Sequence, residues 1–230
     1  MFSVYLDHVK SGEINSLKDL LSKCPKDATI QDENNSSLLH YSAINNRSTI
    51  THLLLDYQAN INTTNDYGDT PLHWAVRKKL YYMVSLLLSR GADLNIKNHN
   101  GYDPLHVACQ TGRFNSVFLL LYYGANPNSV DKNGDTCIMW LIKNKNKKYD
   151  LFSPVYILLR FGASVTISDL EYGNNALHTA ILNDEFDLRT ALLIHNTDLN
   201  VIKSENASGL TPYKVNIIPP LNIKEYKIKF

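Results

Sequence analysis

Apolar residues occur along the chain in pairs of short runs, and a polar stretch rich in Gly, Asn and Asp separates each pair from the next. The first run of a pair contains a Leu-His step that recurs every 33 residues, at Leu39-His40, Leu72-His73 and Leu105-His106. The second run is rich in leucine and ends close to a glycine, as at Gly91, Gly124 and Gly162. Two short apolar runs bounded by such signals predict two short antiparallel helices.

The residues around each Leu-His step explain how the first helix of a pair begins. Thr70 is a good N-cap, and Pro71 suits the first helical turn because the N–H that proline lacks would be unpaired there. We expect His73 to hydrogen-bond to loop backbone and so to connect one unit to the next. The same structural role is expected for the histidines at equivalent positions, His40, His106 and His178.

A period of 33 residues that carries the pattern T-P-L-H-x-A is the signature of ankyrin repeats. The predicted fold is therefore all-α, an ankyrin-repeat solenoid of paired antiparallel helices with β-turn hairpin loops, stabilised by stacking of neighbouring units. We expect a helical cap at 1–31, five repeats, and a partial sixth repeat with an irregular tail at 204–230. The five repeats are assigned to residues 32–64, 65–97, 98–130, 131–168 and 169–203.

Two segments depart from the repeat pattern. In the fourth repeat Met139 replaces the histidine, and the basic run KNKNKK at 143–148 lengthens the connection between the helices. We interpret this run as a solvated loop, with contact to an acidic partner or a lipid headgroup as the alternative. From 215 onward the sequence VNIIPPLNIKEYKIKF does not continue as helices because Pro219-Pro220 blocks them. We therefore expect a truncated or alternatively spliced chain, or a disordered last segment.

Composition excludes several classes of function. The 230 residues carry 23 Lys and Arg against 22 Asp and Glu, so no strong field favours nucleic acid. The three cysteines form no C-x-x-C pair, and neither a signal peptide nor an apolar run long enough to span a membrane occurs. We find no catalytic constellation, metal site or cofactor motif, so the chain is predicted to be a cytoplasmic, monomeric binding protein and not an enzyme, with no direct membrane insertion.

The residue after each motif histidine is expected to face the concave side of the solenoid. This column reads Tyr41, Trp74, Val107, Trp140 and Thr179, and the polar column beside it includes Asn45 and Lys78. Aromatic rings supply much contact area with few rotors to freeze, which favours a peptide-binding groove. In the alternative interpretation the rings only fill the seam between helices. The predicted peptide-binding residues are Asn45, Trp74, Tyr41, Lys78, Val107 and Trp140.

The stretches NNSSLLHYSAINNR, DTPLHWAVRK and GDTCIMWLIK, with the insertion that follows the last, support a more specific resemblance. Residues from roughly 30 to 213 resemble the N-terminal ankyrin domain of the ankyrin-type DHHC palmitoyltransferases, of the Huntingtin-interacting and yeast Akr kind. The resemblance implies recruitment of disordered substrate segments of the form apolar-apolar-x-x-Gln-Pro, through Asn45 and Trp74. It also implies a parent enzyme whose ankyrin domain lies on the cytosolic face of the Golgi or another endomembrane.

Acyl transfer in that family requires an Asp-His-His-Cys domain and membrane spans, and this sequence contains neither. The chain is thus expected to bind substrates without modifying them. A second hypothesis is a free-standing ankyrin scaffold or inhibitor of the IκB or viral host-range kind, which masks a folded partner over many repeats.

Overall fold

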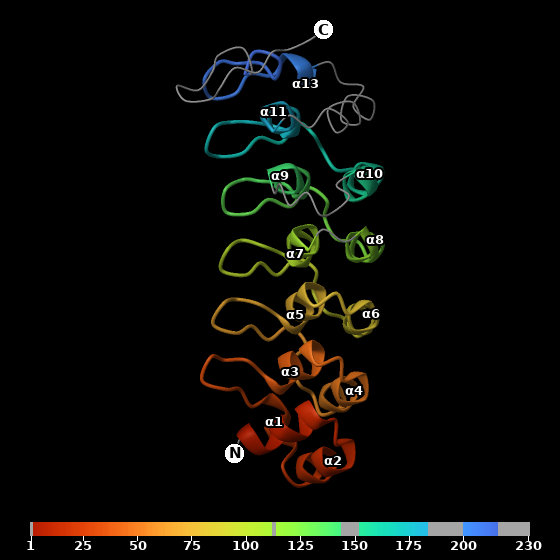
Figure 1. Ribbon diagram of the computed structural model, residues 1–230. Helices are drawn as coiled ribbons and strands as arrows, with labels where there is room; N and C mark the ends of the chain where they lie inside the picture. The colour runs from red at the N-terminus through yellow and green to blue at the C-terminus, as the bar shows by residue number, and fades with distance from the viewer. Residues whose placement is uncertain (1, 112–113, 144–151, 184–199, 216–230) are drawn as a thin grey trace.

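The helices stack in two parallel columns that form one elongated array, with the N-terminal helix at one end and the last described helix at the other (Figure 1). The computed structural model describes residues 2–111, 114–143, 152–183 and 200–215. Hairpin loops project from the side of the inner column that faces away from the outer helices (Figure 1). The predicted all-α ankyrin solenoid is confirmed.

The first four repeats each contribute one inner and one outer helix, and an inner helix is described for the fifth. The inner helices are α3 (Leu38–Ile44), α5 (Pro71–Arg77), α7 (Pro104–Gln110), α9 (Cys137–Lys143) and α11 (Ala176–Leu182). The outer helices are α4 (Ser48–Asp56), α6 (Tyr81–Ser89), α8 (Phe114–Tyr122) and α10 (Phe152–Arg160). The N-terminal cap consists of α1 (Phe2–Ser11), α2 (Ile14–Lys23) and a 3₁₀ turn (Pro25–Thr29), and α13 (Asn200–Lys203) lies near the other end.

The inner helices begin as the sequence predicts. Thr70 caps α5 and Pro71 occupies its first turn, while the backbone N–H of Thr70 donates to Nδ1 of His73 over 3.1 Å. Ser37 and Asn175 cap α3 and α11 in the same way, each with a histidine three residues later. A polar cap at each start satisfies donors that would otherwise be unpaired in the buried first turn.

The repeated histidines connect neighbouring units, and this structural role is confirmed. All four rings are buried, with at most 1% of each residue exposed. The Nε2 atoms lie 2.8, 3.0, 3.4 and 2.9 Å from the carbonyl oxygens of Asp69, Tyr102, Asp135 and Leu210, for His40, His73, His106 and His178 respectively. The last of these bonds reaches the hairpin of the partial sixth repeat.

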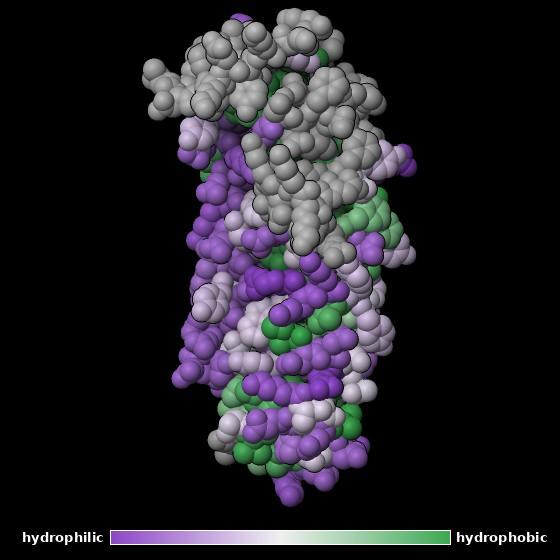
Figure 2. All heavy atoms as spheres, viewed as in Figure 1, coloured by the Kyte–Doolittle hydropathy of each residue, from purple (hydrophilic) through white to green (hydrophobic). Residues whose placement is uncertain are grey.

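Buried polar side chains hold each hairpin closed. In one hairpin Oδ1 of Asn98 accepts from the backbone N–H groups of Asn100 and Tyr102, at 3.0 and 3.1 Å. Successive hairpins are joined by backbone bonds such as the one from His99 N to Tyr67 O, at 2.9 Å. Hydrophilic residues cover this column of hairpins along much of the array (Figure 2). The hairpins therefore form a continuous polar wall beside the inner helices.

Two apolar clusters support the array. One joins the cap to the first repeat and includes Leu17, Leu21 and Leu39, and the other continues through the remaining repeats. Most of the predicted basic loop and the tail after 215 lie outside the described residues. Of the basic run only Lys143 is described, and it belongs to α9.

Candidate peptide-binding site

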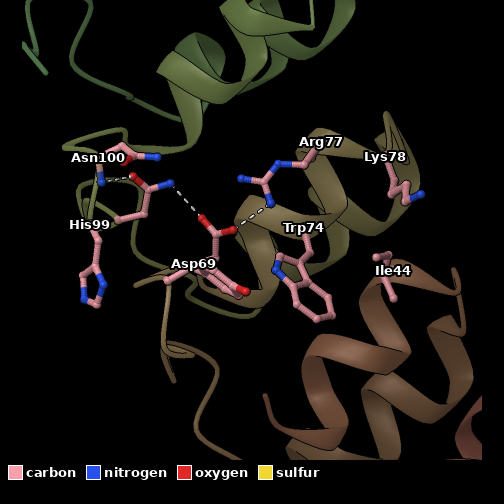
Figure 3. Close-up of a pocket in the computed structure, with 9 residues that line it drawn as sticks. Ile44, Asp69, Trp74, Arg77, Lys78, His99 and Asn100 are labelled. Carbon is pink, nitrogen blue, oxygen red and sulfur yellow. Dashed lines mark hydrogen bonds and ion pairs between the residues drawn. The ribbon is translucent and has the colours of Figure 1, made fainter. Parts of the chain in front are cut away.

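A cavity of about 490 Å³ lies where α3 and α5 meet two hairpins. We call it the Trp74 pocket. Figure 3 shows the Trp74 indole beside Ile44, with Lys78 on the same side and His99 and Asn100 beyond Asp69. The pocket is lined by Ile44, Tyr67, Asp69, Trp74, Arg77, Lys78, Asn98, His99 and Asn100.

The local helix geometry explains why Trp74 reaches this cavity. Its neighbours on α5, including His73 and Ala75, turn into the stack and are buried, which leaves residue 74 half-buried on the inner face. The indole packs edge-on against the Tyr41 ring at 5.7 Å and against the His40 ring at 5.0 Å. Aromatic pairs favour such tilted contacts, so the indole is held in place while part of it lines the pocket.

The polar residues that line the pocket are joined by an ion pair and a hydrogen bond. Nη1 of Arg77 lies 2.7 Å from Oδ2 of Asp69, and Nδ2 of Asn98 donates to Oδ1 of the same carboxylate over 2.8 Å (Figure 3). Burial alone would raise the pKa of Asp69, but the hydrogen bonds from Arg77 and Asn98 outweigh it and hold that pKa below its ordinary value. The carboxylate is therefore ionised and fully engaged.

Tyr41 supports the pocket without lining it. Its hydroxyl donates to Oδ2 of Asp32 over 2.6 Å, and burial together with this carboxylate raises the pKa of Tyr41 to about 12. The phenol thus stays protonated and its orientation is fixed. Nζ of Lys10 lies 5.6 Å from the centre of the same ring, within the range of a cation–π contact.

Asn45 is exposed directly after α3, next to Ile44. Its Nδ2 donates to the carbonyl oxygen of Tyr41 over 2.8 Å, which orients the amide. Among the described residues no donor reaches its Oδ1, so this oxygen is available to a ligand.

Residues 6–98, 83–131 and 105–203 match the sequence family described as ankyrin repeats (3 copies). The chain belongs to the ankyrin-repeat family. Ankyrin repeats form a protein-binding fold, so this chain is a protein-binding module. The ankyrin repeat domain of Bcl-3, a member of the IκB family, has a similar structure, with a TM-score of 0.82 and 26% identity over 92% of each chain.

Among curated proteins, this ankyrin module is similar to palmitoyltransferases. It is 36% identical to human palmitoyltransferase ZDHHC17 over 189 residues, which are 81% of this chain and 29% of that protein. It is 35% identical to mouse palmitoyltransferase ZDHHC13 over 79% of this chain and 28% of that protein. It is 37% identical to Drosophila melanogaster palmitoyltransferase Hip14 over 81% of this chain and 28% of that protein. The predicted resemblance is confirmed, and the chain spans less than a third of each relative's length.

The ankyrin geometry corrects part of the predicted groove. Val107 and Thr179 are 0% and 2% exposed, so the expectation that the whole column faces a ligand is wrong at these positions. The short Val107 side chain belongs to the core, and the Thr179 hydroxyl bonds to the carbonyl oxygen of Asn175. Trp140 is half-buried and packs edge-on against Tyr102 at 6.1 Å, but it does not line the Trp74 pocket.

The pocket also contains residues that the predicted column along the inner helices did not include. Ile44 and Arg77 lie on the inner helices, whereas Tyr67, His99 and Asn100 come from hairpins of adjacent repeats. Tyr67 and Asn100 are separated by one repeat length, so a column drawn through the hairpins would have found them together. Of the predicted site residues, the structure brings Trp74 and Lys78 into one cavity, with Tyr41 and Asn45 beside it.

The helices described in Figure 1 include none that is both long enough and apolar enough to cross a bilayer. Within the described ranges, no cluster of three His, Cys, Asp or Glu side chains has an arrangement that would bind a metal ion. The free thiols of Cys109 and Cys137 are buried, and that of Cys24 is exposed.

Proposed function

We propose that this ankyrin module recruits proteins by binding a short unstructured segment, of the form apolar-apolar-x-x-Gln-Pro, in the Trp74 pocket. The observation that carries the proposal is the half-buried indole of Trp74, held by Tyr41 and His40 with part of it lining an open cavity. A held ring loses little entropy when a ligand packs against it, and such aromatic anchors dominate binding at many interfaces.

The polar groups around the indole suit an extended segment. The Oδ1 atom of Asn45 can accept a hydrogen bond from the backbone or from a glutamine amide of the segment. Ile44 and Trp74 offer apolar contact on one side of the cavity. An extended chain presents both kinds of group at close intervals, whereas a folded surface does so less readily.

The similarity to palmitoyltransferases supports a wider role for this peptide binding. We infer that the module acts on the cytoplasmic side as the substrate-docking domain of a protein S-acyltransferase, whose acyl transfer depends on other segments of that enzyme. Docking a disordered segment raises the effective concentration of its cysteines at the active site, even when the binding itself is of modest affinity.

Isothermal titration calorimetry with an apolar-apolar-x-x-Gln-Pro peptide tests the proposal. Trp74→Ala is expected to weaken binding by about 2 kcal/mol or more, and Asn45→Ala by about 1–3 kcal/mol, since it leaves a polar group of the peptide unpaired. Tyr82→Ala is the matched control, because Tyr82 is an aromatic residue on outer helix α6 and is 67% exposed. Equal binding by the wild type and Trp74→Ala would remove the proposal.

The structural similarity to Bcl-3 favours a second candidate, a free-standing scaffold or inhibitor that covers a folded partner over many repeats. A partner of that kind would bury about 800 Å² of this surface. Its binding would resist competition by a short peptide and would tolerate Trp74→Ala. Competition with the peptide therefore separates the two candidates.

A further inference from the structure

We propose that the segment that binds the Trp74 pocket carries an acidic side chain beside its apolar residues, and that Lys78 selects it. This inference rests on the proposed peptide binding and adds the charge of the ligand. It starts from an imbalance in the pocket, where Arg77 and Lys78 supply two cations and Asp69 is the single acidic residue in the lining.

The carboxylate in the pocket lining already has partners within the protein. Asp69 is 4% exposed, and its two oxygens accept from Arg77 and Asn98. Arg77 thus has its counter-ion within the protein. Lys78 is exposed, and among the described residues its ammonium group has no hydrogen-bond or ion-pair partner. One net positive charge therefore remains at the end of the pocket next to Ile44 (Figure 3).

Comparison with the other repeats separates a structural cation from an available one. Arg77 and Lys143 occupy equivalent positions at the ends of α5 and α9, and each pairs with buried aspartate. The next position, which Lys78 occupies in its repeat, holds the uncharged residues Asn45, Thr111 and Asn183 in others. The repeat architecture does not require a cation at this position.

A second cation, Lys10, lies beside the Tyr41 ring, where the Asp32 carboxylate accepts from the tyrosine hydroxyl. The Tyr41 ring also contacts the Trp74 indole. A segment that contacts both rings would therefore lie near Lys10 as well as Lys78. A carboxylate beside Lys78 would be attracted, and a basic side chain there would be repelled. Near the surface such pairing is sensitive to salt, which provides a direct test.

Lys78 also caps the C-terminus of α5, where a cation stabilises a helix slightly. This structural role would affect stability and would leave the charge preference of the ligand unchanged. The test consequently compares glutamate with glutamine in otherwise identical peptides.

The probe is a set of fluorescein-labelled peptides that contain the apolar-apolar-x-x-Gln-Pro motif between neutral flanks. A single Glu is placed in turn at each x and at each flanking position, and each peptide has a Gln counterpart. We expect one Glu peptide to bind about threefold to fivefold more tightly than its counterpart at about 50 mM salt, with the ratio approaching one at about 500 mM.

Variants of Lys78 test whether this residue causes the preference for Glu over Gln. Lys78→Met keeps the length of the side chain and should bring the Glu-to-Gln ratio to one, and Lys78→Glu should reverse it. Lys132→Met, at an exposed hairpin lysine outside the pocket lining, should leave the ratio unchanged. A thermal denaturation midpoint recorded for each variant shows that it is folded.

The outcomes distinguish this inference from the proposed function. If Glu and Gln peptides bind equally while Trp74→Ala weakens both, acid selection is overturned and peptide docking stands. A Glu preference that persists in Lys78→Met also overturns the role of Lys78. If no peptide in the set binds the wild type, both proposals fail.

Discussion

Nδ1 of His106 lies 2.8 Å from Oδ1 of Asp103, whereas the corresponding atom of His73 accepts a bond from the backbone N–H of Thr70. A carboxylate only accepts hydrogen bonds, and Nε2 of His106 faces the carbonyl oxygen of Asp135. Both nitrogens of His106 therefore carry protons, and its ring is charged. His73 keeps one proton, on Nε2, and is neutral. The residue at the N-cap position of the inner helix thus decides the charge of the buried histidine ring.

The pKa directions agree with this difference. Burial lowers the pKa of His106, but its bonds to Asp103 and to the Cys137 thiol outweigh burial and raise the pKa to about 10. Burial dominates at the other three histidines of this column and holds their pKa values below 6.5. These three rings are His40, His73 and His178.

Asp103→Asn should remove a pH-dependent part of the stability. The folded-state pKa of His106 is about 10, against 6.5 for the ordinary side chain, so its contribution is complete below pH 6.5 and is lost as the pH rises toward 10. The wild type should exceed Asp103→Asn in free energy of unfolding most near pH 6.5, and the difference should shrink as the pH rises toward 10. Urea denaturation over this range measures it, and a constant difference would contradict the charged ring.

Gly101→Ala should destabilise the stack more than Gly91→Ala. Both glycines have positive φ, +81° and +89°, so each alanine introduces similar backbone strain. A Cβ at Gly101 would lie 2.6 Å from the backbone nitrogen of Lys132 in the next hairpin, whereas nothing lies within 4 Å at Gly91. We expect an additional loss of about 1–3 kcal/mol at Gly101 by urea denaturation. Equal losses would show that hairpin contact contributes little.

Lys143→Met should destabilise the fourth and fifth repeats. Nζ of Lys143 lies 2.6 Å from Oδ1 of Asp135 and 3.2 Å from Oδ2 of Asp169, and both carboxylates are at least 94% buried. Without the cation two buried negative charges face each other, at a cost of about 2 kcal/mol or more in the free energy of unfolding. Chemical denaturation at neutral pH measures this loss.

The pH dependence of this variant provides a check. Burial already raises the pKa of Asp135, ahead of the opposing effect of Lys143, and loss of the lysine should raise it further. A carboxyl whose folded-state pKa exceeds its unfolded value gains relative stability as the pH falls. Lys143→Met should therefore regain part of its lost stability below neutral pH. Lys132→Met, at an exposed lysine, should show no such recovery.

The repeat architecture could be predicted because its signals are local. Thr70 and Pro71 start a helix through their own backbone chemistry, and Gly91 ends the next through its positive φ. The motif histidines recur with the same period, so their bonds between repeats followed once the stacking was recognised. Each of these features depends on residues within one unit and its neighbour.

The composition of the pocket depended on the tertiary structure. A column drawn along the inner helices placed Val107 beside Trp74, yet Val107 is 0% exposed because its short side chain stays within the core. Tyr67 and His99 reach the cavity only because successive hairpins stack beside the helices. The sequence by itself determined the helices, their order and the ring at position 74. Tertiary packing decided which side chains stay accessible, because exposure depends on the length and placement of neighbours from other repeats.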